Sequence, residues 1–291
     1  MKKVIVILGP TGIGKTKLSI EIAKSINGEI ISGDSIQVYK RLDIGSAKIK
    51  KEEMEGIKHH LIDILDYNEE YSVSLFQKMV REKIEEINYP IICGGTGLYI
   101  DAAIRDYRFS KERDKSFEDK YKDLSNQELY DLLMKIDPKC SYLHPNNRKR
   151  VLRAIEVYQN DNTSISENKD GNKLIYDCLI LGLSMNRDKL YDRINKRVDI
   201  MIEDGLLEEV KSLYDEGLDI HAIGYKEFYP YFKGEITLDM AIDKVKQNSR
   251  HYAKRQMTWF RHNDDITIID MENENVIADC INLVKNFLKE R

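Results

Sequence analysis

The sequence predicts an α/β fold in which a parallel sheet is flanked by helices and a helical domain is inserted into the chain. Three observations carry this prediction. Short apolar runs rich in β-branched residues recur along the chain, a glycine-rich turn joins the first run to a segment with helical spacing, and charged helical segments replace the apolar runs in the middle of the chain. The 291 residues are enough for one large domain or two smaller ones.

The predicted strands are apolar runs, several of which end at Gly or Asp. They cover residues 4–8, 29–32, 90–93, 174–183 and 266–269. Between the first two, Leu18, Ile22 and Ile26 recur at helical spacing, which predicts a helix over residues 15–26. An alternation of strand, helix and strand is typical of a parallel sheet.

The inserted helical domain is predicted over residues 106–172, so that residues 1–105 and 173–291 form the core domain with the C-terminal helices. Ser125 and Glu128 have the spacing of a capping box, which predicts a helix that ends at Asp137-Pro138. Its apolar stripe, predicted to be core packing, consists of Leu129, Leu132, Leu133 and Ile136. The polar run 160–172, with the turn Asp170-Gly171-Asn172, predicts a loop leading back to the sheet.

Composition excludes several classes of protein. The net charge of -4 gives no general attraction to nucleic acid, so any RNA site has to be a local basic patch. The four cysteines lack the CxxC spacing of a zinc site, and the histidines are scattered apart from His59-His60. The apolar start, residues 4–8, is too short for a signal peptide or a membrane span. We therefore expect a soluble cytoplasmic protein with reduced thiols and no zinc.

The glycine-rich turn has the spacing GxxxxGK[ST] of a phosphate-binding loop (P-loop), placed after a strand and before a helix. Its residues are Gly9, Pro10, Thr11, Gly12, Ile13, Gly14, Lys15 and Thr16. The glycines let backbone N–H groups point at phosphate oxygens, Lys15 brings a positive charge, and the hydroxyl of Thr16 is a ligand for Mg²⁺. The turn therefore predicts a site for a diphosphate or a triphosphate.

Asp34 follows the second predicted strand, at the edge where ligands bind in open parallel sheets. A carboxylate there is able to accept a proton from a nucleophile or to hold Mg²⁺ through water, and it is equally able to cap the next helix. The turn 94–97, Gly-Gly-Thr-Gly, ends another strand at the same edge. It either approaches a ligand or is an ordinary turn.

Basic residues form three clusters, either as solvated helix faces or as phosphate contacts. The clusters are Arg148, Lys149, Arg150 and Arg153; then Arg187, Arg193 and Arg197; then Arg250, Lys254 and Arg261. Arg193 and Arg197 stand four residues apart, so that both project from one helix face and are able to close over a transferring phosphate.

Taken together, the motifs resemble those of the bacterial tRNA dimethylallyltransferases, also called tRNA isopentenyltransferases, over nearly the whole chain. Besides the P-loop, the matching segments are residues 32–40, 42–48, 59–63, 94–99, 144–156, 222–227 and 252–261. Many nucleotide-binding proteins share the P-loop, but the segment 32–40 in combination with His144-Pro145-Asn146 and Lys254-Arg255-Gln256 is much more specific. The segment 115–118 departs from the pattern, since relatives often carry an arginine there against the tRNA.

The resemblance implies that the loop binds dimethylallyl diphosphate with Mg²⁺ and that the acceptor is the N6 amine of adenosine 37, next to the tRNA anticodon. It implies Asp34 as the general base, with Lys15, Thr11 and Arg197 acting on the donor. The implied tRNA contacts are Asp34, Ser35, Ile36, Gln37, Thr96, Lys149, Arg150, Val151, Leu152, Arg153, Gly224, Tyr225 and Lys226. The inserted domain would clamp the anticodon stem, and the chain is expected to act as a monomer.

Two other functions fit the motifs alone. A small-molecule or nucleotide kinase would use the same P-loop, Mg²⁺ and aspartate for phosphoryl transfer. A non-catalytic RNA-binding or nucleotide-switch protein would bind phosphate and RNA without transferring a group, but it would have little use for a base at Asp34.

Overall fold

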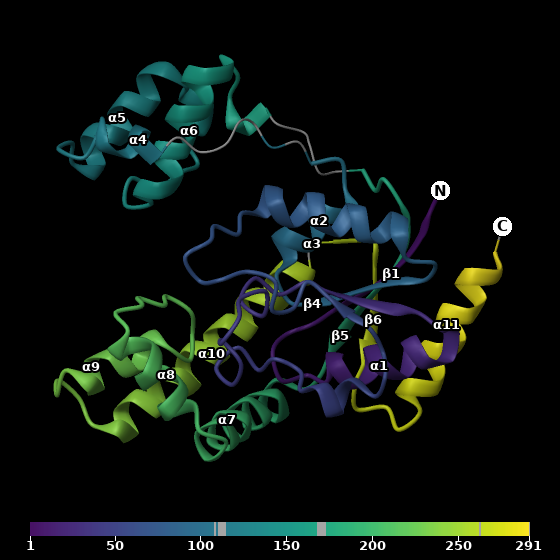
Figure 1. The fold of residues 1–291 in the computed structure, drawn as a ribbon. Coiled ribbons are helices and arrows are strands. Elements are labelled where there is room, and N and C mark those ends of the chain that lie inside the picture. The colour runs from purple at the N-terminus through teal and green to yellow at the C-terminus, as the bar shows by residue number, and fades with distance from the viewer. Residues whose placement is uncertain (108, 110–114, 168–172, 262, 291) are drawn as a thin grey trace. The chain divides into compact units, whose positions relative to one another are not determined.

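The structure is a computed structural model that describes residues 1–107, 109, 115–167, 173–261 and 263–290 (Figure 1). The chain divides into two compact units, one made of Met1–Ile104 with Leu174–Arg291 and the other of Arg105–Lys173. The inserted unit is thus one residue longer at each end than the predicted range 106–172. The predicted turn Asp170-Gly171-Asn172 lies outside the described residues.

The larger unit is built on a six-stranded sheet in which every neighbouring pair is parallel, as predicted. The strand order is β3-β2-β4-β1-β5-β6. The strands are β1 (Lys3–Leu8), β2 (Glu29–Ser32), β3 (His59–His60), β4 (Pro90–Gly94), β5 (Asp177–Ser184) and β6 (Ile266–Asp270). Because the strands run in one direction, the turns that follow β1, β2 and β4 all leave at the same edge of the sheet.

Helices cover both faces of this sheet, which explains why its central strands are apolar throughout. Val4 and Val6 of β1 pack with α2 (Val73–Glu86) and α3 (Gly97–Ile104) on one face. Ile5 and Ile7 point to the other face and pack with α1 (Lys15–Ile26) and α11 (Val276–Lys289). Figure 1 shows these two helical layers. The alternation follows from the period of two residues in a strand.

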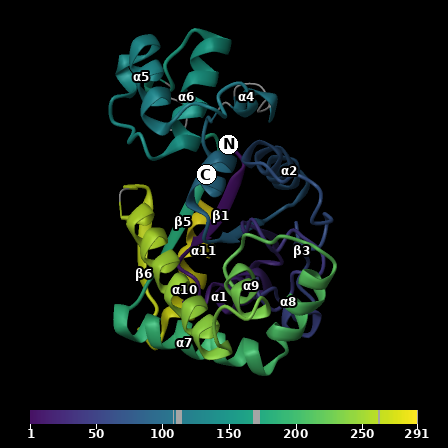
Figure 2. The ribbon, with the colours of Figure 1, turned by 90° about the vertical axis from the view of Figure 1, so that its left-hand side faces the viewer.

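The remaining helices of the larger unit form a third apolar cluster. They are α7 (Arg187–Glu203), α8 (Leu206–Asp215), α9 (Tyr229–Phe232) and α10 (Leu238–Phe260), which lie together in Figures 1 and 2. Helix α10 also reaches the sheet, because Val245 belongs to this cluster while Ala253 and Phe260 pack into the two sheet cores. One long helix therefore joins the helical cluster to both faces of the sheet.

The inserted unit contains α4 (Lys115–Asp119), α5 (Asn126–Ile136) and α6 (Arg148–Asp161) around its own core. The predicted capping box is present, since the Ser125 hydroxyl accepts from the Glu128 N–H at 3.2 Å and Glu128 accepts from the Ser125 N–H at 2.8 Å. Leu129 and Leu133 are fully buried, and Leu132 and Ile136 pack against them. Phe117, in the segment that departs from the family pattern, belongs to this core.

The predicted elements agree closely with the observed ones. Helix α1 has the predicted bounds, and the first, second, third and last predicted strands are correct to within one residue at each end. The strand predicted over 174–183 begins later, at Asp177, because Leu174 and Ile175 pack beside the sheet core before the ladder starts. No bounds were predicted for the helices α2, α3, α8, α9 and α11, and the two-residue strand β3 was not predicted. In the part of the chain that the structure describes, no helix is long and apolar enough to cross a membrane.

Candidate active site at the carboxyl edge of the sheet

The P-loop joins β1 to α1, and the buried side chain of Ile13 anchors it to the core. Ile13 is inaccessible to solvent and packs in the core with α1. Gly12 and Gly14 have φ angles of 79° and 109°, which residues with a side chain rarely adopt. A Cβ at Gly12 would also lie 3.2 Å from the Ile194 side chain. Backbone shape therefore requires glycine at position 14 of the motif GxxxxGK[ST], and also at Gly12, one of its variable positions.

Lys15 places its ammonium group inside this loop, where it donates to the carbonyl oxygens of Gly9 and Pro10, both at 2.9 Å. Although the residue as a whole is only partly buried, its charged end lies among protein atoms. The pKa of Lys15 is lowered to about 8, mainly by this burial and also by Arg197, while Cys93 and Asp34 act in the opposite direction. The charge therefore lacks full compensation, which favours the binding of an anion.

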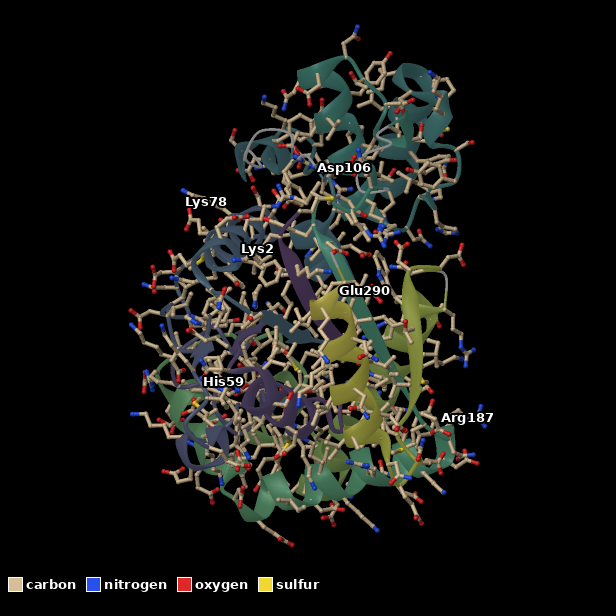
Figure 3. All side chains as sticks on the ribbon, turned by 90° about the vertical axis from the view of Figure 1, so that its right-hand side faces the viewer. Lys2, His59, Lys78, Asp106, Arg187 and Glu290 are labelled. Carbon is tan, nitrogen blue, oxygen red and sulfur yellow. The ribbon has the colours of Figure 1, made fainter. Side chains whose placement is uncertain are left out.

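Arg197 of α7 meets the same loop from the other side. Its Nη1 donates to the Thr11 hydroxyl at 3.2 Å and its Nη2 to the Ala47 carbonyl oxygen at 3.5 Å. Burial lowers the pKa of Arg197, and Asp34 partly opposes that effect. Arg193, one turn earlier, lies close as well, since a Cβ at Gly14 would be 3.7 Å from its Nη2. Arg187 is exposed and pairs with Asp188, and it points away from the ribbon (Figure 3).

Asp34 lies at the same edge, in the turn after β2. Its Oδ1 accepts the N–H groups of Ile36 at 2.8 Å and Gln37 at 3.3 Å, which closes a local turn. Residues 35–38 form no helix, so the helix cap that the sequence allows is not formed. Among the described residues, Oδ2 accepts no hydrogen bond. Because the carboxylate influences the pKa values of both Lys15 and Arg197, it is near both cations. The structure therefore brings the predicted carboxylate and cations together.

The turn after β4 completes the edge. The Thr96 hydroxyl lies 3.4 Å from the hydroxyl of Tyr252 on α10, and Asp34 contributes to raising the pKa of that tyrosine, although burial is the main cause. Gln256, one turn further along α10, contacts both the P-loop and this turn. Sequence reasoning did not select Tyr252 or Gln256 as individual site residues. The only signal was their position in the segment 252–261, which resembles the family.

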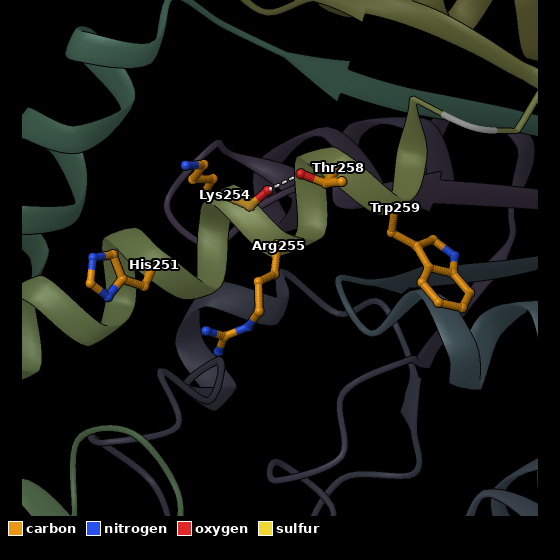
Figure 4. A pocket seen from close by; sticks show the side chains of 5 residues that line it. All are labelled: His251, Lys254, Arg255, Thr258 and Trp259. Atoms are coloured by element: carbon orange, nitrogen blue, oxygen red, sulfur yellow. Dashed lines mark hydrogen bonds between the residues drawn. The ribbon is translucent and has the colours of Figure 1, made fainter. Parts of the chain in front are cut away.

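The exposed side of α10 forms a groove of about 540 Å³ beside this edge. His251, Arg255 and Trp259 project from the same side of the helix, with Lys254 and Thr258 next to them (Figure 4). Trp259 is held by a hydrogen bond from its Nε1 to Asp101 at 3.0 Å. Of the cluster Arg250, Lys254 and Arg261, only Lys254 lines the groove. Arg250 instead donates to Asn195 on α7. The groove combines cations with aromatic surface.

Several residues expected to contact tRNA are used inside the protein. Val151 and Leu152 belong to the core of the inserted unit, and Arg153 pairs with the buried Glu156 at 2.7 Å. Gln37 donates to the carbonyl oxygens of Ser46 and Ala47, each at 3.2 Å. Of the tRNA contacts predicted on α6, mainly Lys149 and Arg150 are left available, because both are exposed.

The segment Gly224, Tyr225 and Lys226 is restricted in the same way. Tyr225 is fully buried, its ring packs against Gly45, and its hydroxyl donates to Glu209 at 2.7 Å. The same carboxylate accepts the N–H groups of Asp43, Ile44 and Gly45. The Tyr225 side chain therefore supports the loop that leads to Ala47, and only Lys226 is exposed.

These features define a class of protein: a P-loop α/β protein whose sheet edge holds buried cations next to a carboxylate. Comparison with known proteins narrows it. A family model described as IPP transferase matches residues 37–263, and a model described as isopentenyl transferase matches residues 2–66. The tRNA dimethylallyltransferase of Anoxybacillus flavithermus is 48% identical, over 99% of this chain and 96% of the relative. That of Bacillus pumilus is 50% identical, over 92% and 89%.

Solved structures agree. The full-length tRNA isopentenylpyrophosphate transferase of Bacillus halodurans is 45% identical with a TM-score of 0.77, over 99% of this chain and 97% of that one. A eukaryotic dimethylallyltransferase acting on tRNA is 32% identical with a TM-score of 0.89, over 100% of this chain and 80% of that one. The chain belongs to the IPP transferase family. It is therefore a prenyltransferase, and the kinase alternative is not favoured.

Proposed function

We propose that this chain transfers the dimethylallyl group of dimethylallyl diphosphate to the N6 amine of adenosine 37 in tRNA, forming N6-isopentenyladenosine. The observation that carries the proposal is that Lys15 and Arg197 both donate to P-loop residues while Asp34 lies in the turn after β2, at the same edge of the sheet. The two cations suit a leaving diphosphate, and the carboxylate suits an acceptor that must lose a proton. Family membership selects this chemistry over phosphoryl transfer.

The donor site consists of the P-loop, Lys15 and Arg197. When the bond between the prenyl carbon and the diphosphate oxygen breaks, negative charge grows on the diphosphate. Lys15, the loop N–H groups and Arg197 stabilise that charge. Because these interactions are stronger in the transition state than in the bound donor, they lower the activation barrier. Thr11, whose hydroxyl already accepts from Arg197, holds the guanidinium beside the loop.

The acceptor amine is a weak nucleophile because its lone pair is delocalised into the adenine ring. As the new bond between N6 and the prenyl carbon forms, Asp34 accepts a proton from N6, and diphosphate leaves. Since Oδ1 is held by the N–H groups of Ile36 and Gln37, Oδ2 is the oxygen placed to act as base. The adenine has to leave its stack to reach this edge, at a cost of a few kcal/mol.

Mg²⁺ fits this site as a partner of the donor. The described residues contain no cluster of three His, Cys, Asp or Glu that would hold a metal ion on its own. Thr16, in the first turn of α1, is exposed and would supply one hydroxyl ligand, with diphosphate oxygens and water as the others. Bound there, Mg²⁺ would neutralise charge on the leaving diphosphate.

The tRNA contacts that the structure leaves available are all at least partly exposed. Lys149 and Arg150 on α6, Lys226 and the groove on α10 are exposed, and Ser35, Ile36 and Thr96 near Asp34 are partly exposed. Cations and aromatic rings are what single-stranded RNA loops require for phosphate and stacking contacts. We place the enzyme in the cytoplasm with its tRNA, acting as a monomer.

The test supplies the purified chain with Mg²⁺, dimethylallyl diphosphate and an unmodified tRNA that carries adenosine at position 37. We expect N6-isopentenyladenosine, identified by mass after nuclease digestion, and one diphosphate released per transfer. A matched tRNA with guanosine at position 37 should remain unmodified, and ATP should not replace the donor. Phosphorylation of an acceptor by ATP, or no prenylation of the adenosine, would contradict the proposal.

A further inference from the structure

The side chain of Gln256 connects three segments that are far apart in the sequence. It lies on α10, is 6% exposed, and reaches the carboxyl edge of the sheet with its carboxamide. Its Oε1 accepts the N–H of Thr11 in the P-loop at 3.1 Å. Its Nε2 donates to the carbonyl oxygen of Gly95, in the turn after β4, at 2.8 Å. One amide thus satisfies a donor in one loop and an acceptor in another.

The surroundings leave room for this side chain and for little else. A Cβ at Gly95 would lie 2.1 Å from the Gln256 Nε2 and 3.0 Å from the carbonyl oxygen of Gly9. Gly95 therefore has to be glycine for the carboxamide to reach both loops. The same contact brings the turn after β4 against the backbone of the P-loop.

Thr11 is consequently held at two points. Its N–H is bound by Gln256, and its hydroxyl accepts from Arg197. Lys15 is held by the carbonyl oxygens of Gly9 and Pro10, the two residues before Thr11. A change in the backbone at Thr11 would therefore move the groups that face both cations of the donor site.

We propose that Gln256 is a positioning residue for the donor, which fixes the P-loop so that Lys15 and Arg197 face the diphosphate together. It also ties the P-loop to Gly95, the neighbour of Thr96 on the acceptor side. The inference rests on the proposed donor site, but it is tested by binding of inorganic diphosphate, which requires no tRNA and no prenyl transfer. A residue that only fills a buried space would not affect that binding.

The test compares Gln256→Met with Gln247→Met. Methionine has a similar length to glutamine and makes neither hydrogen bond. Gln247 is an exposed residue of the same helix that accepts only from Lys244 among the described residues, which makes it the matched control. Calorimetric titration with inorganic diphosphate and Mg²⁺, performed well below the melting temperature of each variant, gives the affinity of the folded protein.

For Gln256→Met we expect diphosphate affinity about tenfold lower than in the wild type, as for the loss of about one hydrogen bond, with the KM for dimethylallyl diphosphate raised in parallel. Binding of an anticodon stem-loop should be unchanged, and Gln247→Met should match the wild type throughout. A lower melting temperature with unchanged diphosphate affinity would show that Gln256 only stabilises the fold, and would overturn the inference. A wild type that binds no diphosphate would contradict the donor site itself.

Discussion

The carboxyl edge of the sheet and the inserted helical unit both carry clusters of basic residues, and they use them differently. At the edge, Lys15 and Arg197 are enclosed by loops, and burial lowers the pKa values of both. In the inserted unit, Lys149 and Arg150 are exposed, while Arg148 donates to the carbonyl oxygens of Tyr121 and Leu124 at 2.6 and 2.7 Å. Without a bound anion, the buried cations at the edge raise the free energy of the folded protein, whereas the exposed cations of the inserted unit do not.

The difference shows how to separate a binding site from a charged surface. Burying a cation costs free energy, so cations buried beside one another indicate that a ligand completes the site. An exposed cation carries no such desolvation cost, and when it contacts the phosphates of a nucleic acid the resulting affinity depends on salt. We therefore expect changes at the sheet edge to affect chemistry and donor binding, and changes on α6 to affect the affinity for tRNA.

The largest effect is expected for Asp34→Asn. Asparagine keeps an oxygen that accepts the N–H groups of Ile36 and Gln37, so the turn is preserved while the base is lost. The kcat for prenyl transfer should fall by about 10²-fold to 10⁴-fold, as for loss of a general base. Steady-state assays with saturating donor and tRNA measure it. Turnover equal to that of the wild type would remove Asp34 from the mechanism.

Arg197→Ala should follow, because it removes a charge that touches Thr11 in the P-loop. We expect kcat/KM for dimethylallyl diphosphate to drop by about 10²-fold to 10³-fold, as when one group that stabilises transition-state charge is deleted. Arg187→Ala is the control on the same helix, since Arg187 is exposed and pairs with its neighbour Asp188. If both variants lost activity equally, a specific role for Arg197 would be excluded.

The double variant Lys149→Ala, Arg150→Ala tests the inserted unit. It should weaken tRNA binding by about tenfold at low salt and reduce the salt dependence of the affinity, while diphosphate binding stays unchanged. Filter binding over a range of salt concentrations measures it. The comparison fails if the salt dependence is unaffected, since these two cations would then contact no phosphate.

The smallest effect, about twofold near pH 8, is that of pH on the use of the donor. Because the pKa of Lys15 in the free protein is lowered to about 8, Lys15 loses its proton as the pH rises through that value. The kcat/KM for the donor should then fall to about half its plateau near pH 8 and by about tenfold for each further unit. The Lys15→Arg variant should not show this decrease at high pH, even if its overall activity is lower, because arginine stays protonated. If the decrease above pH 8 persists in Lys15→Arg, it reflects the titration of another group.

The same shift predicts the direction in which stability changes with pH. Between pH 8 and the ordinary lysine pKa of 10.5, the unfolded chain binds more protons at Lys15 than the folded chain does. This group alone therefore makes the free energy of unfolding rise with pH across that window. Diphosphate, which favours the charged lysine, should reduce the rise.

Local patterns made the core of the fold predictable. The bounds of α1 follow from a glycine loop and an apolar stripe, and the capping box at Ser125 follows from two residues three apart. Helix α2 was missed although Phe76, Val80 and Ile84 recur at helical spacing and are buried, so its signal was present. The strand β3 has only two residues and depends on pairing with β2 rather than on its own pattern.

The site was predictable only in part, because its composition depends on contacts across the chain. The motifs selected Lys15 and Asp34, but Gln256 lies 245 residues from Thr11, the residue it binds. Tyr225 was expected at the RNA, yet the absence of a side chain at Gly45 gives its ring a place in the core. Such choices between surface and interior depend on the tertiary fold and are not encoded in neighbouring residues.

The assignment of a donor role to Arg197 and an acceptor role to Asp34 is tested most directly on two variants, Asp34→Asn and Arg197→Ala. For each, the diphosphate affinity and the single-turnover rate of prenyl transfer are measured. We predict that Asp34→Asn keeps the wild-type affinity for diphosphate and loses the rate, whereas Arg197→Ala loses both. An Asp34→Asn protein whose diphosphate affinity falls as far as its rate, or an Arg197→Ala protein that binds diphosphate as the wild type does, would contradict the assignment of donor and acceptor roles.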